Sequence, residues 1–152
     1  MSLKSIDHLS SISIHDEWET PSILYKEACQ RYNIFPKIDV CATLQNTKCD
    51  VLFTKQTNGL SMRWLKDSYM NPPYSKIKSW IAKAYKEHIE NNISILALTF
   101  AKTDTEWWHK YVDGKTEIHF IKGRLKFINS QTRLPSKNSA PYPSCWIIWR
   151  KK

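Results

Sequence analysis

Residues 93–100 read Ile-Ser-Ile-Leu-Ala-Leu-Thr-Phe, an almost unbroken apolar run. Side chains alternate between the two faces of a strand, so a strand of this composition has to be buried on both faces. The run is much shorter than the roughly 18 apolar residues that indicate a membrane-spanning helix. It therefore predicts a central strand in a sheet that is covered on both sides by helices.

Strand and helix patterns alternate through most of the chain. Expected strands cover residues 37–41, 51–53, 67–70, 93–100, 117–121 and 145–149, and expected helices cover about 20–32, 75–92 and 103–114. Residues 122–144 are long, polar, basic and proline-bearing, which is typical of a loop. The alternation predicts an α/β fold with a mostly parallel, twisted sheet and helices on both faces. In such sheets, ligands bind at the carboxyl ends of the strands.

The helix starts carry capping signals. Thr20 is a favoured N-cap, and Pro21 is tolerated at the first helical position because that N–H has no partner within the helix. Ser75 is expected to cap the clearest helix, and Asn91-Asn92 to end it. The apolar face of this helix is expected to carry Ile77, Trp80, Ile81, Ala84, Tyr85, His88 and Ile89. The opposite face is expected to carry Lys76, Lys78, Lys83 and Glu87.

The charge balance favours a polyanionic partner. Lys and Arg outnumber Asp and Glu by 23 to 14, which gives a formal charge of +9 and a pI near 9.4. Seven tryptophans and seven tyrosines supply anchors for a core and rings on which bases stack. Nucleic acid is the commonest polyanion, and the alternative is a basic surface with no specific partner. The three glycines exclude a phosphate-binding loop built from several glycines.

The length of 152 residues fits one domain, preceded by a flexible polar lead-in at residues 1–15. Neither a signal peptide nor a membrane-spanning run is visible, so we expect a cytoplasmic location and no membrane partner. The four cysteines form no Cys-x-x-Cys pair, so we expect reduced thiols and no bound metal.

The segment Asn71-Pro72-Pro73-Tyr74 is the strongest chemical signal, because two successive prolines force a turn directly after an expected strand. The Asn71 side-chain oxygen and the Pro72 carbonyl are two acceptors that suit the two donors of an –NH2 group. The Tyr74 ring offers a flat surface for a base, worth roughly 1–3 kcal/mol of stacking. The alternative is a plain Pro-Pro turn between a strand and a helix.

The chemistry of an exocyclic amine explains such an arrangement. Its lone pair is delocalised into the ring, which makes the nitrogen a poor nucleophile. Acceptors that hold both N–H groups localise the lone pair, so that the nitrogen attacks a sulfonium methyl group in line. Catalysis then consists of positioning and electrostatics, and the proton leaves after the attack.

These residues resemble the catalytic motif of amino-methyltransferases, (D/N/S)-P-P-(Y/F/W), and the chain resembles the phage-type DNA N6-adenine methyltransferases, called Dam-like. The resemblance covers residues 16 to 149 and rests on seven short motifs in the family's order. These are Asp16-Glu17-Trp18-Glu19-Thr20-Pro21, Ile38-Asp39-Val40-Cys41-Ala42, Asn58-Gly59-Leu60 with Trp64, Asn71-Pro72-Pro73-Tyr74, Thr103-Asp104-Thr105-Glu106-Trp107-Trp108-His109, Gly123-Arg124-Leu125-Lys126-Phe127 and Ala140-Pro141-Tyr142-Pro143-Ser144.

The resemblance implies a compact Rossmann-like fold that uses S-adenosyl-L-methionine as methyl donor. Residues 16–152 would form one catalytic domain without a separate target-recognition domain. The implied reaction is methyl transfer to the N6 of a flipped-out adenine in DNA, in the host cytoplasm or nucleoid if the chain is phage-encoded. Three other acceptors stay open, namely cytosine N4, an RNA base and a protein glutamine, as does a non-catalytic basic nucleic-acid-binding module.

The resemblance also implies a cofactor pocket lined by Trp18, Thr20, Pro21, Asp39, Cys41, Ala42 and Asn71. Asp39 would pair with the cofactor's ammonium group, and the alternative is a turn or capping carboxylate. Cys41 is alternatively a small buried residue. Cys-Ala-Thr replaces the glycine-rich turn of many methyltransferases. No acid stands out for the ribose hydroxyls. Asp50 and Asp67 are candidates, and the alternative for each is a surface or turn carboxylate.

Basic residues in the expected loop are candidates for contacts with DNA phosphates: Lys122, Arg124, Lys126, Arg133 and Lys137. The alternative is a solvated basic face. Recognition of the target sequence would come from residues 122–144 or from an oligomer, and the sequence leaves monomer and homodimer open.

Overall fold

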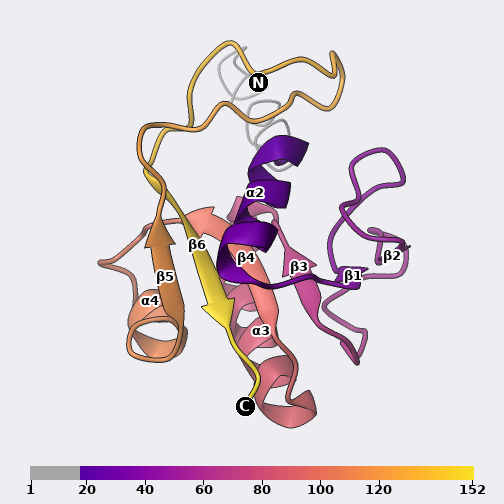
Figure 1. Ribbon diagram of the computed structural model, residues 1–152, viewed down its shortest axis with the longest axis vertical. Helices are drawn as coiled ribbons and strands as arrows, with labels where there is room; N and C mark the ends of the chain where they lie inside the picture. Colours follow the sequence, from indigo (N-terminus) through magenta and orange to yellow (C-terminus); the bar gives the residue numbers. More distant parts are fainter. Residues whose placement is uncertain (1–17) are drawn as a thin grey trace, which may run out of the picture.

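The computed structural model describes residues 18–152 and contains a six-stranded sheet with helices packed on it (Figure 1). The lead-in at residues 1–15, and Asp16 and Glu17 of the first motif, lie outside the described residues. The strands are β1 (Ile38–Asp39), β2 (Val51–Leu52), β3 (Ser68–Met70), β4 (Ile95–Phe100), β5 (Glu117–Phe120) and β6 (Ser144–Trp149). The helices are α2 (Ser22–Tyr32), the 3-10 turn η1 (Tyr74–Lys76), α3 (Ile77–Asn91) and α4 (Glu106–Tyr111).

The sheet has the order β2-β1-β3-β4-β6-β5 and is mixed. The pairs β1–β2, β1–β3 and β3–β4 are parallel, whereas β6 is antiparallel to both β4 and β5. Neighbouring antiparallel strands need no crossover helix, which agrees with the helix-free loop between β5 and β6. The predicted α/β class is confirmed, and the one strand that opposes the others is β6.

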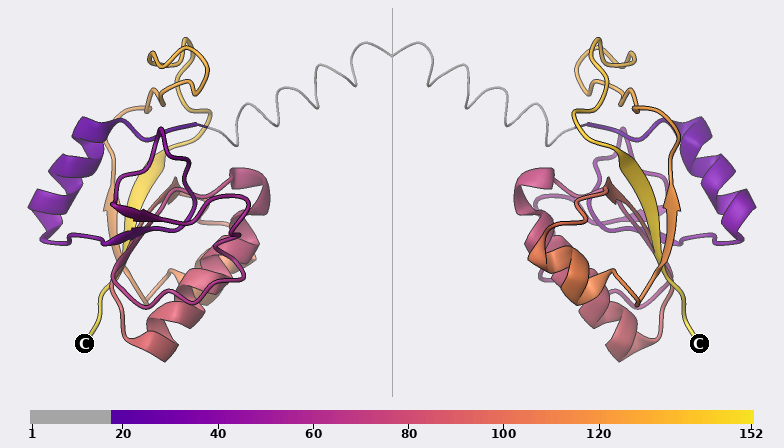
Figure 2. Two further views of the ribbon diagram at one scale, coloured as in Figure 1. Left: turned by 90° about the vertical axis from the view of Figure 1, so that its right-hand side faces the viewer. Right: turned by 90° about the vertical axis from the view of Figure 1, so that its left-hand side faces the viewer.

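Helices cover both faces of the sheet, with α2 on one side and α3 and α4 on the other (Figure 2). All six residues of β4 are buried, as the apolar run predicted. Ile95 and Ala97 belong to the core under α3 and α4, whereas the other face of β4 packs in the core under α2. None of the helices in residues 18–152 combines the length and the apolar character needed to cross a bilayer.

Both predicted N-caps are wrong. Pro21 occupies the cap position of α2 with an extended backbone (ψ 132°), and the Thr20 hydroxyl pairs with the Tyr69 hydroxyl at 2.5 Å. Ser75 lies within η1, so α3 begins at Ile77 with Lys76 at its cap and no side-chain cap bond. Thr20 forms a tertiary hydrogen bond instead of capping α2. Ser75 lies in a tight 3-10 turn instead of capping α3. Asn92 ends α3 in the left-handed region (φ 47°), as predicted.

The predicted apolar face of α3 is confirmed for Trp80, Ile81 and Ala84, which are buried. Ile89 is 60% exposed, contrary to the prediction. Glu87, expected on the opposite face, is buried. Its carboxylate accepts hydrogen bonds from the Trp64 backbone N–H at 2.9 Å and from the Lys83 ammonium at 2.5 Å, and these partners satisfy the buried charge.

The long loop between β5 and β6 covers the end of the sheet at which the parallel strands finish, called here the carboxyl edge. Figure 1 shows it beyond the arrowheads of β4 and β5, at the end where the parallel strands finish. Ile128 of this loop pairs in antiparallel fashion with Glu19, the residue shortly before α2. The carboxyl edge of the sheet is therefore enclosed by the loop and by the segment that leads into α2.

Candidate active site

The ends of β1 and β3 bring the two predicted chemical segments together. These strands pair in parallel, and the Val40 N–H donates to the Tyr69 carbonyl at 3.0 Å just beyond the paired residues. The Cys41 thiol lies beside the backbone N–H of Asn71. From β1 the chain passes to β2 on one side and then to β3 on the other. Such a reversal of strand order opens a crevice at the carboxyl ends, where α/β sheets bind their ligands.

The Asn71 amide is held at both of its ends. Its Nδ2 donates to the Trp18 carbonyl at 3.0 Å, and its Oδ1 accepts from the Tyr74 hydroxyl at 3.3 Å. Pro72 between them is buried. The amide oxygen is thereby fixed in direction, and its role as an acceptor for a substrate amine stays a prediction.

Aromatic rings surround the Tyr74 side chain. Tyr74 stacks on Phe100 at the end of β4, with ring centroids 4.1 Å apart and planes 13° apart. Phe127 of the long loop lies edge-on to Tyr74 at 6.3 Å and stacks on Trp18 at 5.4 Å. Sequence reasoning gave Phe100 no role, although its position as the last residue of a buried strand places it at the same edge. Phe100 and Phe127 are buried, whereas Trp18 and Tyr74 are partly exposed and could stack on a flat heterocycle.

Asp39 has a buried carboxylate with one free oxygen. Its Oδ2 accepts from the Lys48 backbone N–H at 2.9 Å, and within residues 18–152 its Oδ1 has no hydrogen-bond partner. Burial raises the pKa of Asp39 to about 6, although the N–H groups of Lys48 and Cys41 partly oppose that shift. A buried unpaired acceptor is costly unless a ligand supplies the donor. The residue therefore fits a cationic ligand group such as an ammonium.

The comparisons with known proteins agree with this geometry. Residues 9–152 match the family model described as DNA N-6-adenine-methyltransferase (Dam). The DNA N-6-adenine-methyltransferase of Haemophilus phage HP1 (strain HP1c1) is 32% identical over 119 residues, which cover 77% of this chain and 69% of that protein. The DNA N-6-adenine-methyltransferase of Escherichia phage T1 is 30% identical over 139 residues, which cover 79% of this chain and 57% of that protein.

The chain belongs to the DNA N-6-adenine-methyltransferase (Dam) family. The resemblance found in the sequence is thereby confirmed. The cofactor and DNA contacts of this Dam-family chain stay predictions, and the structure adds where each residue lies.

The remaining residues predicted for the cofactor lie at the same edge. Ala42 follows β1, is buried and donates its N–H to the Phe53 carbonyl at 3.0 Å. Burial and the charge of Asp39 hold the pKa of the Cys41 thiol well above its ordinary value, so Cys41 is a neutral thiol rather than a nucleophile. Thr20 is buried on Tyr69, and Pro21 is half-buried at the start of α2. Trp18 and Thr20 thus approach from the segment before α2, and Asp39 approaches from β1.

Neither candidate for the ribose hydroxyls reaches this edge. Asp50 and Asp67 directly precede β2 and β3, so they lie at the amino ends of strands whose carboxyl ends form the site. Asp67 accepts hydrogen bonds from the Ser94 N–H and from the Lys151 ammonium, each at 2.9 Å. Both of its carboxylate oxygens therefore have structural partners. The positions of Asp50 and Asp67 favour the alternative that both are surface or turn carboxylates.

The basic residues predicted for DNA fall into two groups. Lys122, Lys126 and Lys137 are exposed on the long loop. Arg124 is exposed but braces the loop, because it donates to the Pro141 carbonyl at 2.6 Å. The guanidinium of Arg133 pairs with Glu19 and donates to the Gln45 carbonyl at 3.4 Å. Only the first group presents its ammonium groups without such a structural role.

Sequence reasoning missed the ion pairs of Glu19. Its buried carboxylate accepts from the Lys48 ammonium at 3.0 Å as well as from Arg133. Its backbone pairs with Ile128 through hydrogen bonds of 3.1 and 2.9 Å. Lys48 in turn donates its backbone N–H to Asp39, so one chain of contacts joins the long loop to the predicted cofactor carboxylate.

In the described part of the chain, no group of three or more His, Cys, Asp or Glu side chains could hold a metal ion. The expectation of a metal-free enzyme stays a prediction.

Proposed function

We propose that this chain transfers the methyl group of S-adenosyl-L-methionine to the N6 of adenine in DNA. The observation that carries the proposal is the Asn71 amide, fixed by Trp18 and Tyr74 at the end of β3, beside the unpaired Asp39 oxygen at the end of β1. Asn71, the acceptor for an amine, and Asp39, the acceptor for an ammonium, thus lie at the carboxyl ends of two neighbouring strands.

The residues of the motif would prepare the adenine amine. Asn71 Oδ1 accepts one N6–H and the Pro72 carbonyl accepts the other, which holds the amine out of conjugation with the ring. Tyr74 supplies the stacking surface, backed by Phe100. In the free protein the Tyr74 hydroxyl occupies Asn71 Oδ1, so a bound adenine has to replace that hydrogen bond with its own N–H. The Asn71–Trp18 hydrogen bond and the Tyr74–Phe100 stack are formed before the base arrives, which lowers the cost of orienting it.

The residues at the end of β1 would hold the methyl donor, which supplies an electrophilic methyl group on a sulfonium. Asp39 accepts from its ammonium, and the small Ala42 leaves the backbone open to close approach. Trp18, Thr20 and Pro21 provide the wall on the α2 side. Together with the reversal of strand order beside β1, these roles support a compact Rossmann-like methyltransferase fold, with residues 16–152 as a single catalytic domain.

DNA would approach over the long loop. Lys122, Lys126 and Lys137 are exposed there, and a target base has to leave the duplex stack to reach Tyr74. Sequence preference would arise from the loop at residues 122–144 or from an oligomer. A DNA substrate would put the chain in the cytoplasm, or in the host cytoplasm or nucleoid if it is phage-encoded.

The test is methyl transfer from labelled S-adenosylmethionine to DNA, followed by nuclease digestion and mass analysis of the nucleosides. We expect N6-methyladenine. N4-methylcytosine, or label in RNA or protein alone, would overturn the choice of acceptor. Calorimetry with S-adenosylmethionine tests the enzyme against a basic binding module, because such a module would give no cofactor heat while still binding DNA.

The raised pKa of Asp39 predicts how cofactor binding depends on pH. With a pKa of about 6, the carboxylate ionises between pH 5 and pH 7, so affinity for the cationic ammonium should rise about tenfold over that range. The stability of the cofactor-free protein should change in the opposite direction. A carboxyl whose folded pKa is raised stabilises the fold below its ordinary pKa of 3.8, and that contribution is lost as the pH rises through 6.

Calorimetric titrations and thermal melts at pH 5, 6 and 7 measure both effects. Asp39→Asn should weaken binding at pH 7 and remove the pH dependence of both quantities. Asp67→Asn is the matched control at the opposite edge, and it should keep the dependence of cofactor affinity on pH. An unchanged pH profile in Asp39→Asn would contradict the assigned role.

A further inference from the structure

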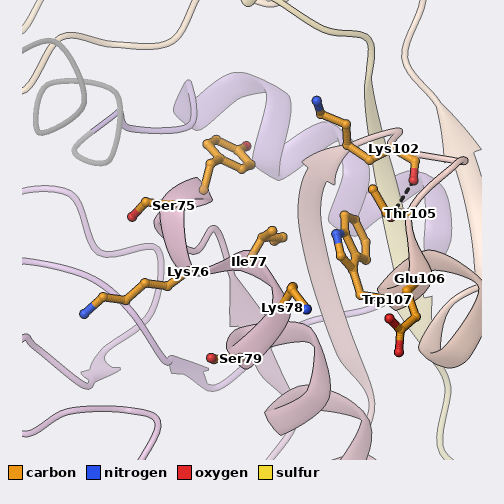
Figure 3. Close-up of a pocket in the computed structure, with 10 residues that line it drawn as sticks. Ser75, Lys76, Ile77, Lys78, Ser79, Lys102, Thr105, Glu106 and Trp107 are labelled. Atoms are coloured by element: carbon orange, nitrogen blue, oxygen red, sulfur yellow. Dashed lines mark hydrogen bonds between the residues drawn. The ribbon is translucent and has the colours of Figure 1, made fainter. Parts of the chain in front are cut away.

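A cavity of about 660 Å³ opens beside Tyr74, between the start of α3 and the start of α4 (Figure 3). Residues 74–79, which lead from the motif into α3, form one wall. The other wall comes from Lys102 and Thr105, between β4 and α4, and from the first two residues of α4, Glu106 and Trp107. The cavity is therefore built from the segments that follow two adjacent parallel strands, at the edge that carries the site.

The charged residues of the cavity lining are mainly lysines. These are Lys76, Lys78 and Lys102, and the only carboxylate in the lining is Glu106. Figure 3 shows the Lys76 side chain extending away from Glu106 and Trp107. Among residues 18–152, none of these three ammonium groups forms a salt bridge, whereas Lys48, Lys83 and Lys151 are all paired. Unpaired cations around a concave surface attract anions, because the low-dielectric walls focus their field. The cavity is thus suited to an anionic ligand.

Aromatic contacts connect the Lys102 ammonium to the motif. The Lys102 Nζ lies 3.3 Å from the centroid of the Tyr142 ring. The Tyr142 ring packs on Phe100 at 5.4 Å, and Phe100 stacks on Tyr74. The cation–π contact holds the ammonium over a ring that is 45% exposed. Lys102 is therefore positioned by the same aromatic cluster that surrounds the predicted base site.

We propose that this cavity binds the phosphodiester backbone of the DNA strand that carries the target adenine, through Lys76, Lys78 and Lys102. The proposal rests on the function proposed above. A flipped nucleotide stays joined to its neighbours, so its flanking phosphates lie beside the pocket that takes the base. Tyr74 belongs to both, since it is the ring of the motif and a wall of the cavity. Lys76 and Lys78 follow it directly along the chain, at exposed positions.

The experiment measures DNA binding at several salt concentrations by fluorescence anisotropy, with a labelled duplex that the wild type methylates. The variants are Lys76→Gln/Lys78→Gln and Lys102→Gln. Each lysine that neutralises a phosphate contributes about 0.9 to the slope of log affinity against log salt. The slope should therefore fall by about 2 in the double variant and by about 1 in Lys102→Gln. The loss of DNA affinity should be the same for all DNA sequences, because phosphate contacts carry no information about the bases.

Lys66→Gln/Lys115→Gln is the control of equal charge. These lysines are exposed and precede β3 and β5, at the amino ends of the strands, so the salt slope should stay that of the wild type. Calorimetry should give wild-type affinity for S-adenosylmethionine in every variant, which verifies the fold. Equal slopes in the Lys76/Lys78 variant and in the control would overturn the proposal while wild-type methylation of DNA continues. A wild type that methylates no DNA would instead overturn the proposed function.

Discussion

Asn71→Ala should lower kcat for methyl transfer to DNA by about 10²–10³-fold, the usual effect of removing one preorganised polar group from a reacting centre. The variant loses the oxygen that accepts N6–H, and it also loses the Nδ2 donor that fixes the Trp18 carbonyl. Single-turnover rates with saturating DNA and cofactor measure the effect. Thermal melting with and without S-adenosylmethionine verifies that the fold and cofactor binding persist.

Two conservative variants separate the contributions to this effect. Asn71→Asp keeps an acceptor towards the base but loses the donor to Trp18, so it should retain more activity than Asn71→Ala. Tyr74→Phe keeps the ring on Phe100 and removes the hydroxyl that occupies Asn71 Oδ1. Because that hydroxyl competes with N6–H, we expect Tyr74→Phe to lower KM for DNA with little change in kcat. Wild-type single-turnover rates in Asn71→Ala would rule out the assigned role.

The parts of the site that lie close together in sequence could be predicted from it. The strand before Asn71, the turn forced by two prolines and the stacking ring form one continuous segment, so local rules suffice. Asp39 was placed correctly at a strand end for the same reason. The buried run in β4 was equally clear, because a strand hydrophobic on both faces has few other solutions.

Other features depend on tertiary contacts, which no local pattern records. Thr20 has the composition of a cap but bonds Tyr69 across 49 positions in sequence. Glu87 lies on the polar side of the helical pattern, yet it is buried because Trp64 and Lys83 supply donors. Sequence rules assign charged residues to the surface. Only the fold shows where hydrogen-bond and ion-pair partners allow a charged side chain to be buried. The same limit hid the role of Glu19, which depends on two partners from distant loops.

Glu19→Gln should destabilise the protein by about 3–5 kcal/mol, the range found when one partner of a buried ion pair is removed. The Lys48 and Glu19 side chains are 6% and 7% exposed, so the substitution leaves the Lys48 charge buried without its carboxylate. Arg133, which is 45% exposed, loses the same partner but remains partly hydrated. Urea unfolding measures the free-energy change. Proteolysis within residues 122–144 should accelerate, because the ion pair that fastens this loop to Glu19 is lost.

Glu90→Gln is the matched control, since Glu90 forms an exposed pair with Lys86 at 4.0 Å and its loss should cost less than about 1 kcal/mol. Glu19→Gln/Lys48→Met should recover most of the stability, because removing both charges leaves no unpaired ion. That double variant would still lack the tie to Arg133, so its loop should stay protease-sensitive although its fold is restored. Stability and loop anchoring are thereby separated. A free-energy change in Glu19→Gln no larger than that in Glu90→Gln would show that the buried Lys48–Glu19 pair stabilises the fold no more than an exposed pair does.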